Sequence, residues 1–476
     1  MDGKQAYDII VIGGGGAGLA AAIEAAQSDA RVLIVDADSK LGGTTARSTG
    51  VYYAAGTSVQ RAAGIEDDAR RMYDYYMTLN QYNAEPSIVR VLCDGAEPGF
   101  NWLAALGVKF DPKDLYQSGV DGVARGHKPV EGGSGIVRKL RGALDGRDNV
   151  AIMLHTRVER LIVENGAVTG IATGGRTIRA RTVIVTTGGL GQSKAMWGRY
   201  YPKATALGDW VWAMATQHCR GDGLNLCAAA GAAIQGWNAG HLMMTANFDH
   251  RIEVGRCNWA VCVNREGRRF ADEAMSSYVF SNVVGKQTGG SCFAVFDEAA
   301  RLAAKRPPGT AHVSGLYADN WCDTAIAKHA DAGKIVREDS IEELANAIGI
   351  FNPAALANTL SQFNRDVEMG HDSRFFKNPS LLRSVSTPPF YAVEMKPAII
   401  GMTFAGPRVD KAARVIGEDE KPIGGLYAAG ECVGNVIGEQ YVGGGISITN
   451  AIVFGRIAGA EAARYARGVP REGASA

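Results

Sequence analysis

The sequence predicts an α/β fold built on a parallel sheet, and three observations support this class. An apolar run, residues 9–12, leads directly into a cluster of glycines, as a strand buried on both faces does. A stretch of helical character, residues 19–26, follows the glycines, and a second apolar run covers residues 31–35. Glycine is also enriched, with 61 among 476 residues, or about 13% where about 7% is usual. This order of elements predicts a βαβ unit whose backbone approaches a ligand closely.

Length, charge and cysteine usage argue against several classes of protein. At about 100–200 residues per domain, 476 residues predict two or three domains. The 50 basic and 49 acidic residues leave a net charge of +1, so we expect no nucleic-acid partner. No apolar run reaches the ~20 residues of a membrane span and the first residues do not resemble a signal peptide, so we expect no membrane span and a cytoplasmic location. The 8 cysteines show no CxxC pair and no metal-ligand spacing, which argues against a redox dithiol and a metal site.

The glycine cluster is the first motif that carries chemistry. It reads Gly13-Gly14-Gly15-Gly16-Ala17-Gly18, a GxGxxG, and lies between the expected strand and helix. A tight turn of this kind brings the backbone N–H groups of a helix N-terminus to a pyrophosphate. Asp36 ends the second strand about 20 residues later, where dinucleotide-binding proteins place an acid that accepts ribose hydroxyls. We therefore expect a dinucleotide to contact Gly13, Gly15, Gly16, Ala17, Gly18, Asp36 and Ala37.

Two later segments indicate which dinucleotide binds. Residues 40–50 combine glycines with hydroxyl side chains, which suits a second phosphate and a ribitol better than the next αβ unit of an NAD domain. Near the C-terminus, Gly430-Glu431 follows a short strand and suits the ribityl chain. The glycines 443–445 precede a helical stretch, 448–464, whose N–H groups could stabilise negative charge on a reduced flavin. We therefore predict FAD, held by Lys40, Gly42, Gly43, Thr44, Thr45, Ser48, Thr49, Gly50, Gly430, Glu431 and Gly445.

These segments resemble the fumarate reductase/succinate dehydrogenase/3-ketosteroid dehydrogenase superfamily of flavoproteins over nearly the whole chain. Residues 44–50 resemble its flavin loop, residues 186–191 its mid-chain turn from strand to glycines, and residues 220–223 its GDG motif. Covalently flavinylated relatives carry a histidine in the flavin loop, which this chain lacks, so the resemblance implies non-covalent FAD. It adds cofactor contacts at Val158, Thr187, Gly188, Gly189, Asp222, Ser447 and Ile448.

The resemblance also implies the organisation of the chain. We expect a Rossmann-like FAD-binding domain of the GR2 type, formed by residues 1–236 and 395–476. An α+β capping or substrate domain, residues 237–394, would be inserted between these two parts. The glycine-rich strand motifs support this division, because they stop near Gly236 and resume at Gly424. Flavin enclosed between two domains lies in the water-excluded cleft that hydride transfer requires.

The substrate depends on positions where fumarate-reducing members carry cations or imidazoles. Ser277-Tyr278 stands where their proton-donor arginine belongs, Tyr441 replaces an arginine that binds a carboxylate, and Met402 replaces a histidine. A dicarboxylate would have too few partners to offset the desolvation of two charges. Glu253 and Arg256 are retained near the proton relay of those members, as part of a relay or as a structural ion pair.

The two tyrosines resemble those of 3-ketosteroid dehydrogenases, of the Δ1 or the Δ4-(5α) type. The Δ4-(5α) enzymes carry a serine two residues after the C-terminal tyrosine, where this chain has Gly443. In this interpretation Tyr441 and the N–H of Gly445 hold a substrate carbonyl as an oxyanion hole does, Tyr278 exchanges the proton, and hydride passes to flavin N5. Which tyrosine is the base stays open at this stage. The expected substrate is a small apolar, steroid-like ketone, with an unknown electron acceptor.

Two alternative functions come from other classes. One is a fumarate reductase-like reductase of another unsaturated carboxylate, and the other is an electron-carrying flavoprotein subunit. The absence of a CxxCH motif and of a cysteine cluster argues against the second alternative. Five further side chains are candidates for the pocket wall or simply for the core: His241, Tyr52, Tyr53, Tyr116 and His127.

Overall fold

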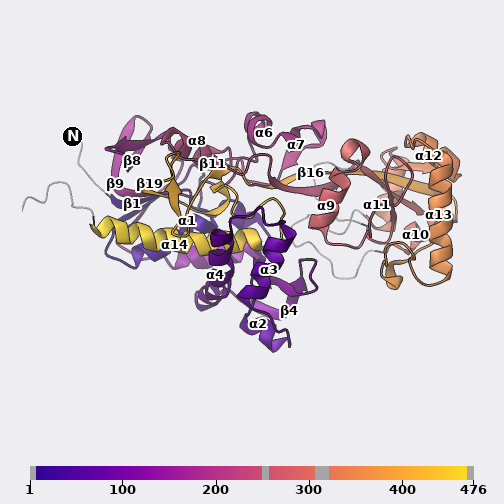
Figure 1. Ribbon diagram of the computed structural model, residues 1–476, viewed down its shortest axis with the longest axis horizontal. Coiled ribbons are helices and arrows are strands. Elements are labelled where there is room, and N and C mark those ends of the chain that lie inside the picture. The colour runs from indigo at the N-terminus through magenta and orange to yellow at the C-terminus, as the bar shows by residue number, and fades with distance from the viewer. Residues whose placement is uncertain (1–6, 249–256, 306–320, 469–476) are drawn as a thin grey trace, which may run out of the picture. The chain divides into compact units, whose positions relative to one another are not determined.

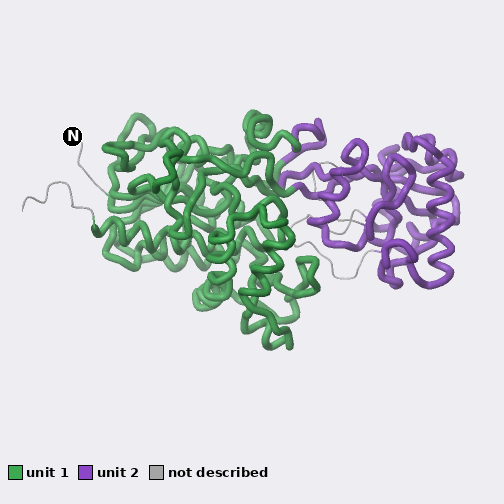
Figure 2. The backbone as a smooth tube through the Cα atoms, in the orientation of Figure 1, with its two compact units in different colours: residues 1–203, 213–241, 401–476 green, residues 204–212, 242–400 purple. Residues whose placement is uncertain are grey.

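The computed structural model describes residues 7–248, 257–305 and 321–468. The chain forms two compact units, which Figure 2 shows in green and purple. Unit 1 comprises Met1–Lys203, Ala213–His241 and Gly401–Ala476, and unit 2 comprises Ala204–Trp212 and Leu242–Ile400. That these units act as a cofactor domain and a capping domain stays a prediction.

Unit 1 is built on an eight-stranded sheet with the order β18-β19-β8-β9-β1-β2-β6, in which β7 also pairs with β8. The central strand β1 runs parallel to both of its neighbours, β2 and β9. Ile9, Ile10 and Val11 of β1 are fully buried, as expected for a strand covered on both faces. The predicted α/β class is therefore confirmed. The strands are β1 Tyr7–Ile12, β2 Val32–Val35, β6 Val150–Met153, β7 Arg160–Glu164, β8 Ala167–Thr173, β9 Arg176–Val185, β18 Arg414–Ile416 and β19 Pro422–Ala428.

Two helices that are far apart in the sequence pack side by side against this sheet, α1 Gly16–Ala26 and α14 Ile446–Gly468 (Figure 1). Their close approach depends on small residues. A Cβ atom at Gly459 of α14 would lie 2.2 Å from the carbonyl oxygen of Ala21, and one at Gly455 would lie 2.5 Å from that of Ala17. The C-terminal helix is thereby held against the helix that follows the glycine turn.

The remaining elements of unit 1 include a small sheet and several helices. A three-stranded sheet has the order β3-β5-β4, and β11 pairs with β17. The helix α3 packs against α4, and α4 packs against α14. These elements are η1 Thr44–Arg47, β3 Tyr52–Tyr53, α2 Ser58–Ala62, α3 Ala69–Leu79, α4 Pro86–Ala105, β4 Phe110–Gln117, β5 Ala124–Pro129, α5 Gly132–Gly142, α6 Lys194–Tyr200, α7 Pro202–Thr205, α8 Asp222–Ala229, β11 Ile234–Gln235, β17 Gly406–Pro407 and η6 Gly430–Cys432.

A second sheet forms the centre of unit 2, with the order β10-β16-β14-β13 and with β12 and β15 also paired to β16. Alternate residues of its strands point to opposite faces. Val261 and Val263 pack with α12 and α13, whereas Cys262 between them packs with α9 and α11. Helices therefore cover both faces of this sheet. The elements are β10 Trp212–Ala213, β12 Gly240–Ala246, β13 Val261–Val263, α9 Ser277–Gly285, β14 Cys292–Asp297, α10 Glu298–Ala303, α11 Asp323–Asp331, β15 Val336–Glu338, α12 Ile341–Ala347, α13 Pro353–Glu368 and β16 Phe390–Thr403.

None of the helices in the described ranges combines the length and the apolar character that a bilayer crossing requires.

Candidate active site

The predicted dinucleotide turn lies between β1 and α1, and its first and last glycines each have a steric reason. Gly13 has φ +99°, and a Cβ atom there would lie 2.5 Å from the carbonyl oxygen of Thr186. A Cβ atom at Gly18 would lie 1.9 Å from the carbonyl oxygen of Gly13, which explains the close packing of helix against strand. Gly15 differs, because a Cβ atom there would meet nothing within 4 Å. The open side of the turn is therefore at Gly15, where the fingerprint requires room for a pyrophosphate.

The N-terminus of α1 suits an anion. The N-cap residue, Gly15, provides no side-chain cap, and no acidic residue lies in the first turn, where Gly16 and Ala17 stand, although the Thr45 hydroxyl accepts from Gly16 N at 3.3 Å. The N–H groups of a helix start need partners, and the helix dipole favours negative charge there. The backbone of α1 therefore presents a phosphate site of the kind predicted.

Asp36 lies at the end of β2, and its carboxylate holds the loops together. Its Oδ2 accepts a hydrogen bond from Gly14 N at 2.7 Å, and its Oδ1 accepts one from Asp38 N at 2.8 Å. Gly42, with φ +130°, donates its N–H to Gly14 O at 2.8 Å. Ala37 and Lys40 lie in the loop between these contacts. A ribose contact at Asp36 stays a prediction, since the carboxylate also accepts from the loop backbone.

The loop of residues 43–50 lies against the glycine turn and is braced by its own hydroxyl groups. Gly43, with φ +50°, faces Gly15. The Oγ1 atom of Thr45 accepts from Gly16 N at 3.3 Å, and the Ser48 hydroxyl donates to Thr45 O at 2.9 Å. Gly50 N donates to Ser48 Oγ at 3.1 Å, and Thr49 lies between these two residues. The hydroxyls of Thr45 and Ser48 thus shape the loop, which leaves backbone groups to meet a cofactor.

Thr44 faces the opposite side of this loop. Its Oγ1 accepts from Thr216 N at 3.3 Å and lies 3.6 Å from Cys219 Sγ. Cys219 in turn limits the space at Gly188, where a Cβ atom would lie 2.8 Å from its sulfur. The buried thiol of Cys219 therefore contacts both the loop of residues 43–50 and the mid-chain turn.

The mid-chain turn after β9 contains a buried hydroxyl that lacks a partner. Thr187 Oγ1 forms no hydrogen bond among the described residues. Such groups are rare in protein interiors and often mark a missing ligand. Gly189, next along the turn, packs against Glu431, and a Cβ atom there would lie 2.2 Å from its Oε1. The turn therefore combines a buried hydroxyl donor with closely packed backbone.

Glu431, in η6, is half-buried against the same turn. Its Oε1 accepts hydrogen bonds from Thr403 N at 3.1 Å and from Thr403 Oγ1 at 3.3 Å. Burial raises the pKa of Glu431 to about 7, although these hydrogen bonds favour the ionised form. Gly430, with φ +82°, faces Ala17 of α1. The open turn at Gly15 and the N-terminus of α1, whose first turn holds no acidic residue, together fit FAD at this end of the sheet.

Val158, a predicted cofactor contact, is connected to Asp222 of the GDG motif through an ion pair of its neighbour Arg157. Val158 is buried, and Asp222 begins α8. Arg157 Nη1 donates to Asp222 Oδ1 at 2.7 Å. The GDG motif is thus tied by an ion pair to the segment that carries Val158.

Tyr441 is the better defined of the two predicted catalytic tyrosines. It is buried, and its ring stacks on the imidazole of His241 with centroids 4.6 Å apart and planes at 14°. Its hydroxyl lies 3.2 Å from Ser447 Oγ, at the start of α14. Burial raises the pKa of Tyr441, whereas hydrogen bonds from the Ser447 side chain and from the N–H groups of Ser447 and Gly445 lower it. The phenol oxygen is therefore held at the N-terminus of a long helix.

The surroundings of Tyr441 include an imidazole that stays neutral. Burial, with a smaller effect of Lys203, lowers the pKa of His241 to about 3. The imidazole is therefore uncharged near neutral pH. Interaction with Tyr441 also raises the pKa of the phenols of Tyr76 and Tyr116, whose own burial is the larger cause. Gly445, with φ +108°, immediately precedes α14, and Ile448 lies in the first turn of that helix.

Tyr278 lies in unit 2, at the second residue of α9. Its carbonyl accepts a hydrogen bond from Asn282 Nδ2 at 3.2 Å. Because Tyr441 belongs to unit 1, their joint action on one substrate stays a prediction. Glu253 and Arg256 lie outside the described residues.

Two of the weaker candidates have partners typical of the protein interior. The hydroxyl of Tyr52 donates to Ala96 O at 3.0 Å. The imidazole of His127 lies 2.7 Å from Thr57 Oγ1 through Nε2 and 2.8 Å from Arg125 O through Nδ1. Burial lowers the pKa of His127 to about 4, so it too is neutral near pH 7. These contacts brace the loop around α2.

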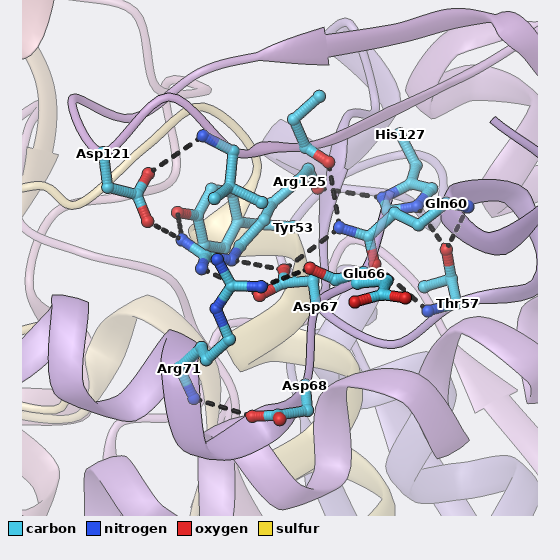
Figure 3. A network of polar contacts seen from close by, with 12 residues as sticks. Tyr53, Thr57, Gln60, Glu66, Asp67, Asp68, Arg71, Asp121, Arg125 and His127 are labelled. Atoms are coloured by element: carbon cyan, nitrogen blue, oxygen red, sulfur yellow. Dashed lines mark hydrogen bonds and ion pairs between the residues drawn. The ribbon is translucent and has the colours of Figure 1, made fainter. Parts of the chain in front are cut away.

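Sequence reasoning missed a buried ion network beside Tyr53, which Figure 3 shows. Arg125 is 1% exposed, and its Nε and Nη2 donate to the two carboxylate oxygens of Asp67 at 2.7 and 3.0 Å. Its Nη1 donates to Asp121 Oδ2 at 2.6 Å and to Tyr53 Oη at 3.4 Å. Asp67 is 58 residues from Arg125, so no local pattern in the sequence indicates their pairing.

No group of His, Cys, Asp or Glu side chains suited to a metal ion occurs within the ranges that the structure describes.

Comparison with known proteins agrees with this geometry. The sequence model of a family described as "FAD binding domain" matches residues 8–448. A fumarate reductase (cytochrome) of Shewanella frigidimarina is 30% identical over 97% of this chain and 77% of its own length. A urocanate reductase of Eggerthella lenta is 30% identical over 96% of this chain and 75% of its own length. The structure of a 3-ketosteroid Δ4-(5α)-dehydrogenase from Rhodococcus jostii in complex with 4-androstene-3,17-dione superposes with TM-score 0.79, at 24% identity and covering 96% of both chains.

Proposed function

This chain belongs to the FAD binding domain family, and from that premise we propose that it transforms a carbon–carbon bond next to the carbonyl of an apolar, steroid-like ketone. It is an FAD-dependent oxidoreductase that acts on CH–CH bonds, and it falls within the fumarate reductase superfamily. The ketone is the proposed part. We further propose that FAD is held without a covalent bond, because residues 43–50 contain no histidine.

The observation that carries the proposal is the neutral aromatic setting of Tyr441. A dicarboxylate needs cations to offset the cost of desolvating two charges. Tyr441 has a neutral imidazole against its ring and the Ser447 hydroxyl at its phenol oxygen. A neutral carbonyl needs hydrogen-bond donors only, and the phenol and the N–H groups at the start of α14 supply them.

The chemical step follows from ordinary ketone reactivity. In the oxidative direction a proton leaves the α-carbon, hydride leaves the β-carbon with its electron pair, and a C=C bond forms between them. Bound FAD supplies the two-electron acceptor for that hydride. Tyr441 and the N–H of Gly445 stabilise the negative charge that develops on the carbonyl oxygen, and Tyr278 exchanges the proton. The reductive direction reverses each transfer.

A second candidate is the reduction of an unsaturated carboxylate. The curated relatives favour it, because proteins that are 30% identical are described as fumarate and urocanate reductases. A planar acid with one carboxylate requires fewer cations than fumarate does. In this alternative Tyr441 would bind a neutral part of the substrate.

Anaerobic flavin spectroscopy distinguishes the two candidates. We expect reduced enzyme to be reoxidised by 4-androstene-3,17-dione, or oxidised enzyme to be bleached by the saturated ketone. Fumarate and urocanate, mixed with the same reduced enzyme, should leave it reduced. Reoxidation by either acid and not by the enone would favour the second candidate. If neither class reacts and only a redox protein reoxidises the flavin, the chain is an electron-carrying subunit.

A further inference from the structure

The segment that carries Tyr441 has no regular secondary structure. Residues 433–445 form neither helix nor strand. Backbone groups outside a helix or sheet need other partners when they are buried. Something else in unit 1 must therefore fix the backbone on either side of Tyr441.

Helix α3 and the residue that ends it supply these partners. Tyr76 Oη donates to Val436 O at 3.3 Å. The Asn80 amide pairs with Gln440 in both directions, since Gln440 N donates to its Oδ1 at 2.8 Å and its Nδ2 donates to Gln440 O at 3.4 Å. Tyr75 Oη donates to Val442 O at 2.7 Å. Hydrogen bonds from this helix thus reach the residues immediately before and after Tyr441.

Tyr53 confines the same segment from another side. A Cβ atom at Gly443 would lie 2.6 Å from the Tyr53 ring. The backbone of Tyr53 is held by α14, because its N–H donates to Thr449 Oγ1 at 2.9 Å and its carbonyl accepts from that hydroxyl at 2.8 Å. The ring of Tyr53 is therefore a fixed surface against which residue 443 rests.

Arg125 connects the two tyrosines. Its guanidinium lies 5.4 Å from the ring centroid of Tyr75 and 6.0 Å from that of Tyr53, within the range of cation–π attraction. One edge of the guanidinium donates two hydrogen bonds to Asp67, and the other edge donates one to Asp121 (Figure 3). Its plane is thereby fixed, and so are the rings that lie against it.

We propose that Arg125 is a positioning residue for Tyr441, which it holds in place through the rings of Tyr75 and Tyr53 and their contacts with residues 442–443. Its effect on catalysis rests on the function proposed above. Its effect on the backbone does not, because the contacts exist whatever the substrate. A displacement of about 1 Å at a catalytic group commonly costs on the order of 100-fold in rate, so a fixed backbone on both sides of Tyr441 matters.

Two variants of the FAD-loaded protein test the proposal. Tyr75→Phe removes the hydroxyl that bonds to Val442 and keeps the ring. Arg125→Lys keeps a cation but loses the planar guanidinium, which forms two hydrogen bonds with Asp67 and lies against two tyrosine rings. The matched control is Tyr427→Phe, which removes a tyrosine hydroxyl that donates to Glu461 O at 3.4 Å in the same unit.

The first readout is hydrogen exchange followed by mass spectrometry. We expect peptides covering residues 436–446 to exchange on the order of tenfold faster in Tyr75→Phe and in Arg125→Lys, and as in wild type in Tyr427→Phe. FAD content should match wild type in all three. Unchanged exchange of this segment in Tyr75→Phe would overturn the proposal. That result would stand even if Arg125→Lys failed to fold.

The second readout is turnover of 4-androstene-3,17-dione or of its saturated counterpart. We expect kcat to fall about tenfold in Tyr75→Phe, while KM changes less than about twofold, since a misplaced catalytic group weakens the transition state more than ground-state binding. Equal kcat in Tyr75→Phe and wild type would contradict the catalytic part. If wild type turns over neither ketone, the proposed function fails, and the exchange experiment still decides whether Arg125 fixes the segment.

Discussion

Arg125 in unit 1 and Arg269 in unit 2 are both buried and both form two-pronged ion pairs, yet their remaining contacts differ. Arg269 donates from Nε and Nη2 to the two oxygens of Glu273, each at 2.9 Å, and from Nη1 and Nη2 to Asp372 at 3.0 and 2.9 Å. Lys377 completes this cluster with Nζ 3.1 Å from Glu273 and 2.9 Å from Ala260 O. Two cations balance two acids there.

The network of Arg125 is balanced differently. It contains two acids for one cation, with Asp67 buried and Asp121 22% exposed. The edges of the guanidinium bind the acids, and tyrosine rings lie against it. Those tyrosines contact the segment of Tyr441, whereas the Arg269 cluster joins residues 260–273 to residues 372–377. The comparison indicates that a buried arginine acts as a structural clamp or as a positioning group according to what its neighbours touch.

The largest expected effect concerns the Arg269 cluster of unit 2. Arg269→Met should leave Glu273 and Asp372 buried without their main cation, and removal of one partner from such a cluster costs about 3–5 kcal/mol. Guanidinium denaturation should therefore show a loss of that size in the free energy of unfolding, with unit 2 unfolding first. Loss of less than about 1 kcal/mol would show that Lys377 alone balances both acids.

Tyr278→Phe is expected to change rate and not stability. Tyr278 lies five residues after Glu273 of the Arg269 cluster. It belongs to α9, so its backbone should stay in place. The variant should keep its FAD and slow flavin reduction by about 100-fold, the usual contribution of a general acid or base. Stopped-flow absorbance measures this rate. An unaltered rate would remove Tyr278 from the mechanism.

Gly443→Ala tests the contact between the Tyr441 segment and Tyr53. The new methyl group would lie 2.6 Å from the ring, and overpacking of this kind typically costs about 1–3 kcal/mol. We expect kcat to fall about tenfold with FAD retained. The control is Gly142→Ala, where a Cβ atom meets nothing within 4 Å. An equal fall in kcat in Gly443→Ala and Gly142→Ala would mean that the contact with Tyr53 has no special role.

The smallest expected effect is the loss of stability at low pH that comes from Asp372 in the Arg269 cluster. Burial favours the protonated form of Asp372, but hydrogen bonds from Arg269 and from the N–H groups of Arg374 and Phe375 outweigh it and lower its pKa to about 2. A depressed pKa means that its stabilising contribution is present above pH ~3.8 and is lost as the pH falls toward 2. Wild type should therefore lose more unfolding free energy between pH 5 and 2.5 than Asp372→Asn does. Parallel losses would contradict this assignment.

Much of the fold and the cofactor could be predicted because their signals are local. Residues 9–18 contain a buried strand, a glycine turn and a helix start, and these three features allow few alternatives. The α/β class, the superfamily, the enzyme class and FAD are confirmed. The steroid-like substrate, the cytoplasmic location and the individual site residues stay predictions.

The surroundings of the catalytic tyrosines could not be predicted in the same way. Sequence reasoning singled out Tyr441 but missed its stacking on His241, 200 residues earlier in the chain. It treated Ser447 only as a cofactor contact, whereas its hydroxyl lies 3.2 Å from the phenol oxygen of Tyr441. It weighed Tyr53 only as a pocket wall and did not consider Tyr75. No spacing rule connects Tyr75 with Val442, which lies 367 residues away.

The glycine turn, its strand and its helix can be inferred from the residues alone, because backbone sterics and side-chain periodicity act over a few residues. The folded arrangement is needed to know which charges are buried together and which hydrogen bonds hold the irregular segment of Tyr441. Those choices depend on contacts between α3, β5 and the C-terminal segment, and such contacts exist only after distant parts of the chain have packed. The physical reason is that an ion pair or a ring contact is specified by position in space, on which separation along the chain places no limit.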